Sequence, residues 1–152
     1  MSNKDESTFG VMSPSECHQL LGAGTIGRIG VVVDGYPLII PLNYAMDGET
    51  VVVRTEPGTV VARADQTRVS FQIDGFDPAD RSGWSVLMRG RAQALTVEDR
   101  DELIERTRAT GVTPWAPGDR SLWIRIEPAD LSGRRIKPGD DLQWSLGYAA
   151  YM

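Results

Sequence analysis

Alternation of apolar and polar residues first appears after residue 24 and predicts a β-hairpin. Two β-rich runs, Thr25–Val33 and Tyr36–Tyr44, flank Asp34-Gly35, a pair that favours the type I′ turn of a two-residue hairpin. Pro37 and Pro41 lie in the second run. Because proline cannot donate to a strand ladder, this run is expected at a sheet edge or in an irregular strand.

Further β-rich runs extend this hairpin into a larger sheet. Asp47-Gly48 is a second hairpin signal and leads into a third strand, which completes an antiparallel meander. The later predicted strands are Arg68–Asp74, Gly83–Leu95 and Leu122–Glu127. Gly90 marks a bend in the long fifth strand, and Pro128 is expected to stop the sixth.

Short helical segments interrupt the strands. Ser13-Pro14-Ser15-Glu16 forms a capping box with proline at the first helical position, and this helix is expected to end at Gly22. Residues 59–65 are predicted as a short helix. Residues 96–99 form a second capping box, which opens a helix to about residue 110. Six antiparallel strands with inserted short helices indicate a mostly β chain that forms a small antiparallel barrel.

Composition excludes several classes of protein. Hydrophobic residues make up 41% and charged residues 24% of the 152 residues, as in soluble globular domains. The longest apolar stretches, Val31–Val33 and Leu38–Ile40, fall far short of the ~20 residues of a membrane helix. No secretory signal is visible, so a cytoplasmic protein without membrane association is expected. A single cysteine, Cys17, and a single histidine, His18, disfavour disulfide, zinc and Ser-His-Asp chemistry.

The charge balance is acidic, with a formal net charge of −5. Such a chain does not attract nucleic acid over long range, so a nucleic-acid partner is not expected. Fourteen of the 16 basic residues are arginines. The base composition of the genome explains most of that bias. Arginine also suits bidentate recognition of phosphate, so a local binding pocket for an anion remains an alternative.

The segment Arg54-Thr55-Glu56-Pro57-Gly58-Thr59 is the strongest candidate for such a pocket. A helix that begins at Gly58-Thr59 would present free backbone N–H groups to an anion, and Arg54 and Thr55 at the strand end would add contacts. The alternative is a plain turn in which Thr59 caps the helix. Neither interpretation is favoured by the local residues alone.

Other polar and aromatic residues fit the edge and faces of a planar ligand. Asn43 lies near an expected bend, and its side-chain amide can both donate and accept hydrogen bonds at the edge of a planar ring. Asparagine in such a place more often forms hydrogen bonds within a turn. Strand alternation places Ser85 and Arg91 on the same face of the fifth predicted strand, and Trp123 and Arg125 on the same face of the sixth. Exposure to solvent is the simpler explanation for the arginines. Trp115 lies in a proline-bounded loop. Together these residues favour a phosphorylated planar cofactor over a catalytic triad or a metal site.

These motifs, in this order, resemble the pyridoxamine 5′-phosphate oxidase-like FMN-binding split β-barrel family. The resemblance covers residues 13–135, which leaves 1–12 as an expected mobile N-terminal tail and 136–152 as a C-terminal extension. The matching segments are Ser13–Glu16, Gly27–Gly30, Pro41–Tyr44, Val53–Thr55, Gly58-Thr59, Trp84–Val86, Gly90–Ala92 and Trp123–Pro128.

The resemblance implies a six-stranded split β-barrel that forms a homodimer with FMN at the subunit interface. It implies that Arg54, Thr55, Gly58 and Thr59 hold the phosphate and ribityl chain, and that Asn43 and Ser85 face the flavin ring. Residues that would reach the flavin from the partner subunit are Trp123, Arg125 and Trp115. Arg91 matches the family's Gly-Arg pattern.

The chain departs from the family at several positions. Relatives commonly carry a lysine or another polar residue after Gly-Thr, where this chain has Val60. The histidine of nitroimidazole-reductase-like relatives and the pyridoxal phosphate-binding residues of the true oxidases are not recognisable, so neither activity is expected. An FMN-dependent oxidoreductase acting on a small-molecule substrate is the leading hypothesis. The alternatives are a deazaflavin (F420)-dependent reductase and a non-enzymatic flavin carrier.

Overall fold

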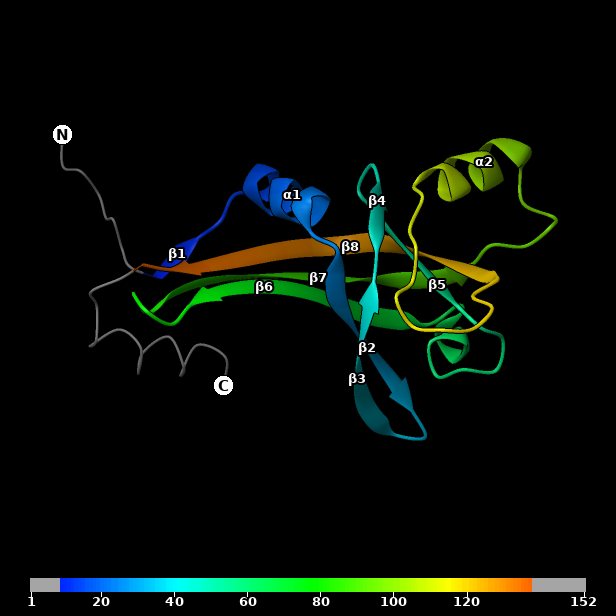
Figure 1. Ribbon diagram of the computed structural model, residues 1–152, viewed down its shortest axis with the longest axis horizontal. Coiled ribbons are helices and arrows are strands. Elements are labelled where there is room, and N and C mark those ends of the chain that lie inside the picture. The colour runs from blue at the N-terminus through cyan, green and yellow to red at the C-terminus, as the bar shows by residue number, and fades with distance from the viewer. Residues whose placement is uncertain (1–8, 138–152) are drawn as a thin grey trace.

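The computed structural model describes residues 9–137 and contains an antiparallel sheet with two short α-helices (Figure 1). In chain order the elements are β1 (Phe9–Val11), α1 (Pro14–Ala23), β2 (Ile26–Val33), β3 (Tyr36–Asn43), β4 (Ala45–Asp47), β5 (Thr50–Thr55), the 3₁₀ turn η1 (Ala62–Ala64), β6 (Arg68–Asp77), β7 (Ser82–Ala94), α2 (Asp101–Ala109) and β8 (Leu122–Ile136). Within the described residues, neither helix has the length and apolar character that crossing a bilayer requires.

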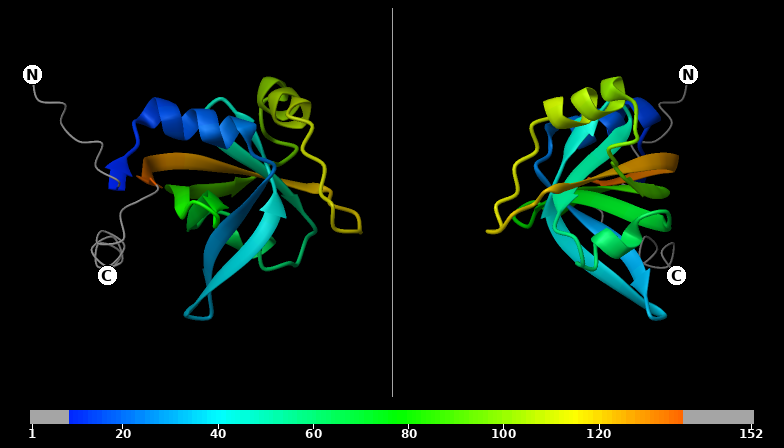
Figure 2. Two further views of the ribbon diagram at one scale, coloured as in Figure 1. Left: turned by 60° about the vertical axis from the view of Figure 1, so that its left-hand side comes forward. Right: turned by 90° about the vertical axis from the view of Figure 1, so that its right-hand side faces the viewer.

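The sheet curls into a half-open barrel. Its strand order is β3-β2-β6-β7-β8-β5-β4, and β1 pairs with β8 outside this path. Figure 2 shows the curled sheet, with both helices on one side and the β2–β3 hairpin extending away from them. This architecture confirms the predicted split β-barrel class.

The first hairpin forms as its sequence predicts. Asp34 and Gly35 have φ values of 52° and 81°, and a type I′ turn requires positive φ at both central residues. β3, which contains both prolines, lies at one end of the strand order. The prediction of an edge strand is therefore confirmed.

The prediction that Pro128 ends the last strand is wrong. β8 continues to Ile136, and Pro128 lies opposite Gly90 at a shift of register in the β7–β8 ladder. The next pair is Arg89 with Asp130, so one residue of β8 is left over as a bulge. A bulge tolerates proline because the ladder is already interrupted there.

Three further boundaries differ from the sequence predictions, and two extra strands, β1 and β4, are present. Residues 9–11 form β1 and Met12 is buried, so this part of the predicted mobile tail is ordered. Residues 59–65 contain only the short turn η1. The capping contact at residue 96 exists, with Asp99 Oδ2 accepting from the backbone N–H of Thr96, but α2 begins at Asp101.

The core fills the concave side of the sheet. Alternate residues of β7, Val86, Met88 and Ala92, are fully buried, whereas Arg89 and Arg91 are exposed, as strand alternation predicts. All of Thr50–Val53 in β5 is buried. Both faces of β5 are therefore covered by the rest of the chain.

The packing of α1 against β8 leaves no space at Gly133. A Cβ built there lies 2.6 Å from Sγ of Cys17 and 3.0 Å from Cβ of Met12. We expect Gly133→Ala to lower the free energy of unfolding by about 1–3 kcal/mol, because overpacking forces neighbouring groups apart. Urea unfolding would measure this change.

Gly22 provides the matched control for Gly133→Ala. It lies exposed in α1 with no atom within 4 Å of a built Cβ. Gly22→Ala is expected to stabilise the fold by about 0.5–1 kcal/mol, because alanine loses less backbone entropy than glycine in a helix. Equal effects of the two substitutions would contradict this account of the packing.

Candidate functional site

A pocket of about 340 Å³ lies between β2, the end of β3, the end of β5 and the loop that follows α2. We call it the Arg54 pocket. Its polar lining comes from Asn43, Arg54, Thr55 and Arg120, and the rest of its lining is apolar, including Val61 and Trp115. The fold therefore brings together four residues proposed from the sequence: Asn43, Arg54, Thr55 and Trp115.

Arg54 is held firmly by the loop across from it. Its Nε donates to the carbonyl of Arg120 at 3.0 Å and its Nη1 to the carbonyl of Val112 at 3.3 Å. The guanidinium also stacks on the Trp123 ring, 4.7 Å from the centroid, which adds a cation–π contribution. No hydrogen bond of Nη2 is seen among the described residues, so the guanidinium keeps unused donor capacity.

Arg120 is the second cation of the pocket, and nothing in the local sequence distinguishes it from the other arginines. Its Nη2 donates to the carbonyl of Pro117 at 3.2 Å. Its Nε is buried without a hydrogen-bond partner. Only the folding of the loop onto β5 places this side chain beside the pocket.

The turn at Gly58-Thr59 does not have the geometry that the helix hypothesis requires. Gly58 has φ +84° and no α-helix follows. The Thr59 hydroxyl donates to the carbonyl of Glu56 and accepts from the N–H of Ala62. Its oxygen also lies 2.7 Å from that of Thr55. These contacts agree with Thr59 as a cap of the turn, and no α-helix begins at Gly58-Thr59.

Val60 and Val61, the two residues that directly follow Gly58-Thr59, carry no charge. Val60 packs partly buried against the core, and Val61 is buried and lines the pocket. Positive charge near the pocket therefore comes from Arg54 and Arg120 rather than from the residue after Gly-Thr.

Asn43 holds the pocket's loop in place. Its Oδ1 accepts from the backbone N–H of Trp115 at 2.8 Å, and its Nδ2 lies 3.5 Å from the carbonyl of Thr25. The Trp115 side chain is 71% exposed at the pocket. Asn43 thus forms hydrogen bonds with nearby backbone, as such residues commonly do, while Trp115 leaves a flat aromatic surface accessible beside the pocket.

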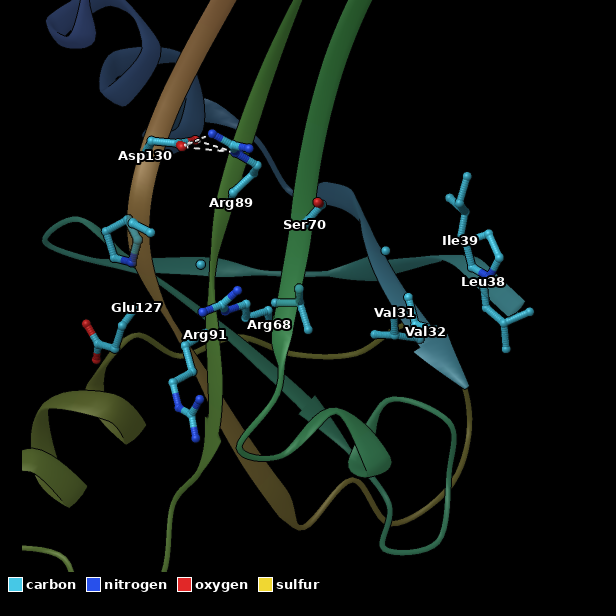
Figure 3. Close-up of a pocket in the computed structure, with 16 residues that line it drawn as sticks. Val31, Val32, Leu38, Ile39, Arg68, Ser70, Arg89, Arg91, Glu127 and Asp130 are labelled. Atoms are coloured by element: carbon cyan, nitrogen blue, oxygen red, sulfur yellow. Dashed lines mark hydrogen bonds and ion pairs between the residues drawn. The ribbon is translucent and has the colours of Figure 1, made fainter. Parts of the chain in front are cut away.

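Two other proposed residues lie outside the Arg54 pocket. Ser85 lies in the middle of the sheet, opposite Asp74 on β6 and Arg134 on β8. Arg91 lines a separate groove of about 820 Å³ on the outer face, directly opposite Arg68. Figure 3 shows both arginines in this groove.

Arg125 is buried and forms ion pairs with Asp47 and Glu127. Only 6% of its side chain is exposed. Its Nη1 donates to Asp47 Oδ2 and to Thr107 Oγ1, both at 2.8 Å. Arg106 of α2 also donates to Asp47 at 3.0 Å. These bonds join α2 and β4 to β8, and Arg125 does not line the Arg54 pocket of its own chain.

This network determines how Asp47 responds to acid. Partial burial works against the charge of Asp47, but the hydrogen bonds and positive charges of Arg125 and Arg106 outweigh it and hold the pKa of this carboxyl below its usual value. Because the pKa of Asp47 is lower in the folded than in the unfolded chain, its contribution is complete above about pH 4 and is lost as the pH falls through the folded value.

We therefore expect the stability difference between the wild type and Asp47→Asn to shrink as the pH falls from 7 to 3. Urea unfolding at each pH would measure it. A difference that stays constant over this range would show that the Asp47 charge does not contribute.

Within residues 9–137, no group of three or more His, Cys, Asp and Glu residues is arranged to hold a metal ion. Cys17 is buried, as its place on an apolar helix face predicts, and burial raises the pKa of its thiol.

Comparison with known proteins identifies the family. The family model for pyridoxamine 5′-phosphate oxidase matches residues 13–135. Uncharacterized protein RA0666 of Rhizobium meliloti is 34% identical over 128 residues, which cover 81% of this chain and 82% of that protein. The chain therefore belongs to the pyridoxamine 5′-phosphate oxidase family.

Solved structures with this fold include flavin-binding proteins. The FAD binding protein from Mycobacterium smegmatis has a TM-score of 0.73 and 33% identity, covering 86% of this chain and 100% of its own. An FAD-binding protein from Mesorhizobium loti has a TM-score of 0.67 and 28% identity, covering 85% of this chain and 99% of its own.

Proposed function

We propose that this chain binds a flavin, FMN in the leading hypothesis, with its phosphate in the Arg54 pocket, and acts as an oxidoreductase on a small molecule. The observation that carries this proposal is the pairing of Arg54 and Arg120 in a pocket whose lining contains no acidic residue. Both arginines have donor nitrogens without partners in the described chain. Guanidinium donors fit phosphate oxygens well.

Family membership supports the same cofactor class. Two structural relatives bind FAD, and both FMN and FAD contain a phosphate next to the ribityl chain. The flavin supplies the redox chemistry when bound. The chain itself binds the phosphate, positions the ring and covers part of it, with Trp115 as an accessible aromatic surface in the same subunit.

A homodimer is part of this proposal. Val32 and Ile39 are 69% and 73% exposed and lie on the outer face of the β2–β3 hairpin, with Tyr36 exposed near its turn. Clustered exposed apolar side chains are typical of protein interfaces. A second copy packed on this face would cover them and could complete the site around the flavin ring.

The first experiment is an absorbance spectrum of the purified protein, followed by titration of FMN, FAD and deazaflavin F420 with fluorescence detection. We expect saturable binding of one flavin per subunit, with light scattering giving the mass of a dimer. Turnover with reduced nicotinamide and a generic acceptor would then separate an oxidoreductase from a carrier, because a carrier gives no rate above that of free flavin. A protein that binds none of the three cofactors would contradict the proposal.

A further inference from the structure

We infer that Arg120 is a phosphate ligand of the Arg54 pocket and acts together with Arg54. This inference rests on the proposed function for the identity of the ligand, a flavin phosphate. It goes further in assigning a binding role to a residue that the sequence motifs do not indicate.

The first support is the unmet hydrogen-bonding capacity of Arg120. Its Nε is buried and has no acceptor, while Nη2 is anchored to the Pro117 carbonyl at 3.2 Å. A buried charged donor without a partner is costly. A shift of the Arg120 side chain that brings Nε to a ligand oxygen would remove that cost.

The second support is the charge of the pocket. Neither Arg54 nor Arg120 forms a salt bridge within the described residues, and the pocket lining contains no carboxylate. Two guanidinium groups that line one largely apolar pocket, in a protein of net charge −5, favour the binding of an anion there. A phosphate dianion matches that charge and presents oxygens to both groups.

The third support is the way in which the loop is fixed. Arg54 Nε donates to the backbone carbonyl of Arg120 at 3.0 Å, so one arginine positions the other. Gly118 of the same loop packs against Glu56, where a Cβ would collide with the carboxylate. These contacts therefore hold the backbone at Arg120 beside the pocket before any ligand arrives, which lowers the entropic cost of binding.

Paired titrations with FMN and riboflavin test this inference, because riboflavin lacks the phosphate. In Arg120→Met we expect FMN affinity to fall about 10- to 100-fold, as for loss of a charged hydrogen bond, while riboflavin affinity stays within about twofold of the wild type. Arg108→Met is the matched control. It removes the same charge from an exposed position on α2 outside the pocket and should change neither affinity.

A second variant and a flavin-free measurement keep the outcome decisive. Arg120→Lys keeps the charge and should recover part of the FMN affinity if Arg120→Met misfolds, which circular dichroism would reveal. Inorganic phosphate, at matched ionic strength, should raise the melting temperature of the wild type and Arg108→Met but not of Arg120→Met.

Three results would overturn the role of Arg120. They are equal losses of FMN and riboflavin in Arg120→Met, unchanged FMN affinity, or a phosphate effect that disappears in Arg91→Met and persists in Arg120→Met. The last result would place the anion in the outer groove. If the wild type binds neither flavin, the proposed function fails, and the phosphate measurement still decides whether Arg120 binds an anion.

Discussion

Replacing Arg54 by methionine is expected to lower FMN affinity by about 100-fold, since a hydrogen bond to a charged group contributes about 1.5–3 kcal/mol. Arg54 stacks on Trp123 and holds the loop through the carbonyls of Val112 and Arg120. The substitution thus removes a phosphate donor and releases the loop that carries the second arginine. Fluorescence titration of FMN would measure the effect.

Two further measurements distinguish these contributions of Arg54. Riboflavin affinity should also fall in Arg54→Met, because the loop that carries Trp115 loses its anchor. This result differs from that expected for Arg120→Met. Arg54→Lys should be intermediate, because lysine keeps the charge but not the planar fork that reaches two carbonyls. Unchanged FMN affinity in Arg54→Met would refute the assignment of the phosphate to this pocket.

Replacing Asp47 by alanine is expected to destabilise the fold by about 3 kcal/mol, because removing one partner of a buried ion pair leaves the other charge uncompensated. Arg125 is 6% exposed and loses its 2.8 Å bond to Asp47. Thr107 Oγ1 and Glu127 Oε1 remain near it, at 2.8 Å and 3.4 Å, so the loss falls at the lower end of the range for buried pairs. Urea unfolding at pH 7 would measure it.

Asp130→Ala is the control for Asp47→Ala. Asp130 pairs with the exposed Arg89 on the neighbouring strand (Figure 3), and solvent screens such pairs strongly. This variant should leave the melting temperature nearly unchanged. If both substitutions destabilise the protein equally, burial is not what gives the Asp47–Arg125 pair its importance.

Much of the fold follows from local sequence signals. The Asp34-Gly35 turn depends on backbone angles that these two residues adopt readily, so the sequence predicted the β2–β3 hairpin correctly. Strand alternation likewise favoured solvent exposure for Arg91 of β7, which is exposed in the structure. These features depend on neighbours along the chain, which the sequence displays directly.

Long-range pairing determined the features that the sequence did not predict. Pro128 continues a strand because Gly90 lies opposite at a bulge, and residues 9–11 form a strand because β8 extends far enough to pair with them. Neither partner can be recognised from the residues nearby. The predicted C-terminal extension lies mostly outside the described residues.

The candidate site likewise combines features that local sequence determines with features that long-range contacts determine. The sequence by itself determined the strand end that carries Arg54 and Thr55, because a β-rich run followed by Pro-Gly sets that boundary. Tertiary structure alone decided that Arg125 lies buried against Asp47 and that Arg120 lies at the pocket with an unpaired nitrogen. The physical reason is that burial and charge pairing depend on which distant segments meet, and an arginine has the same chemistry in either place until the chain folds around it.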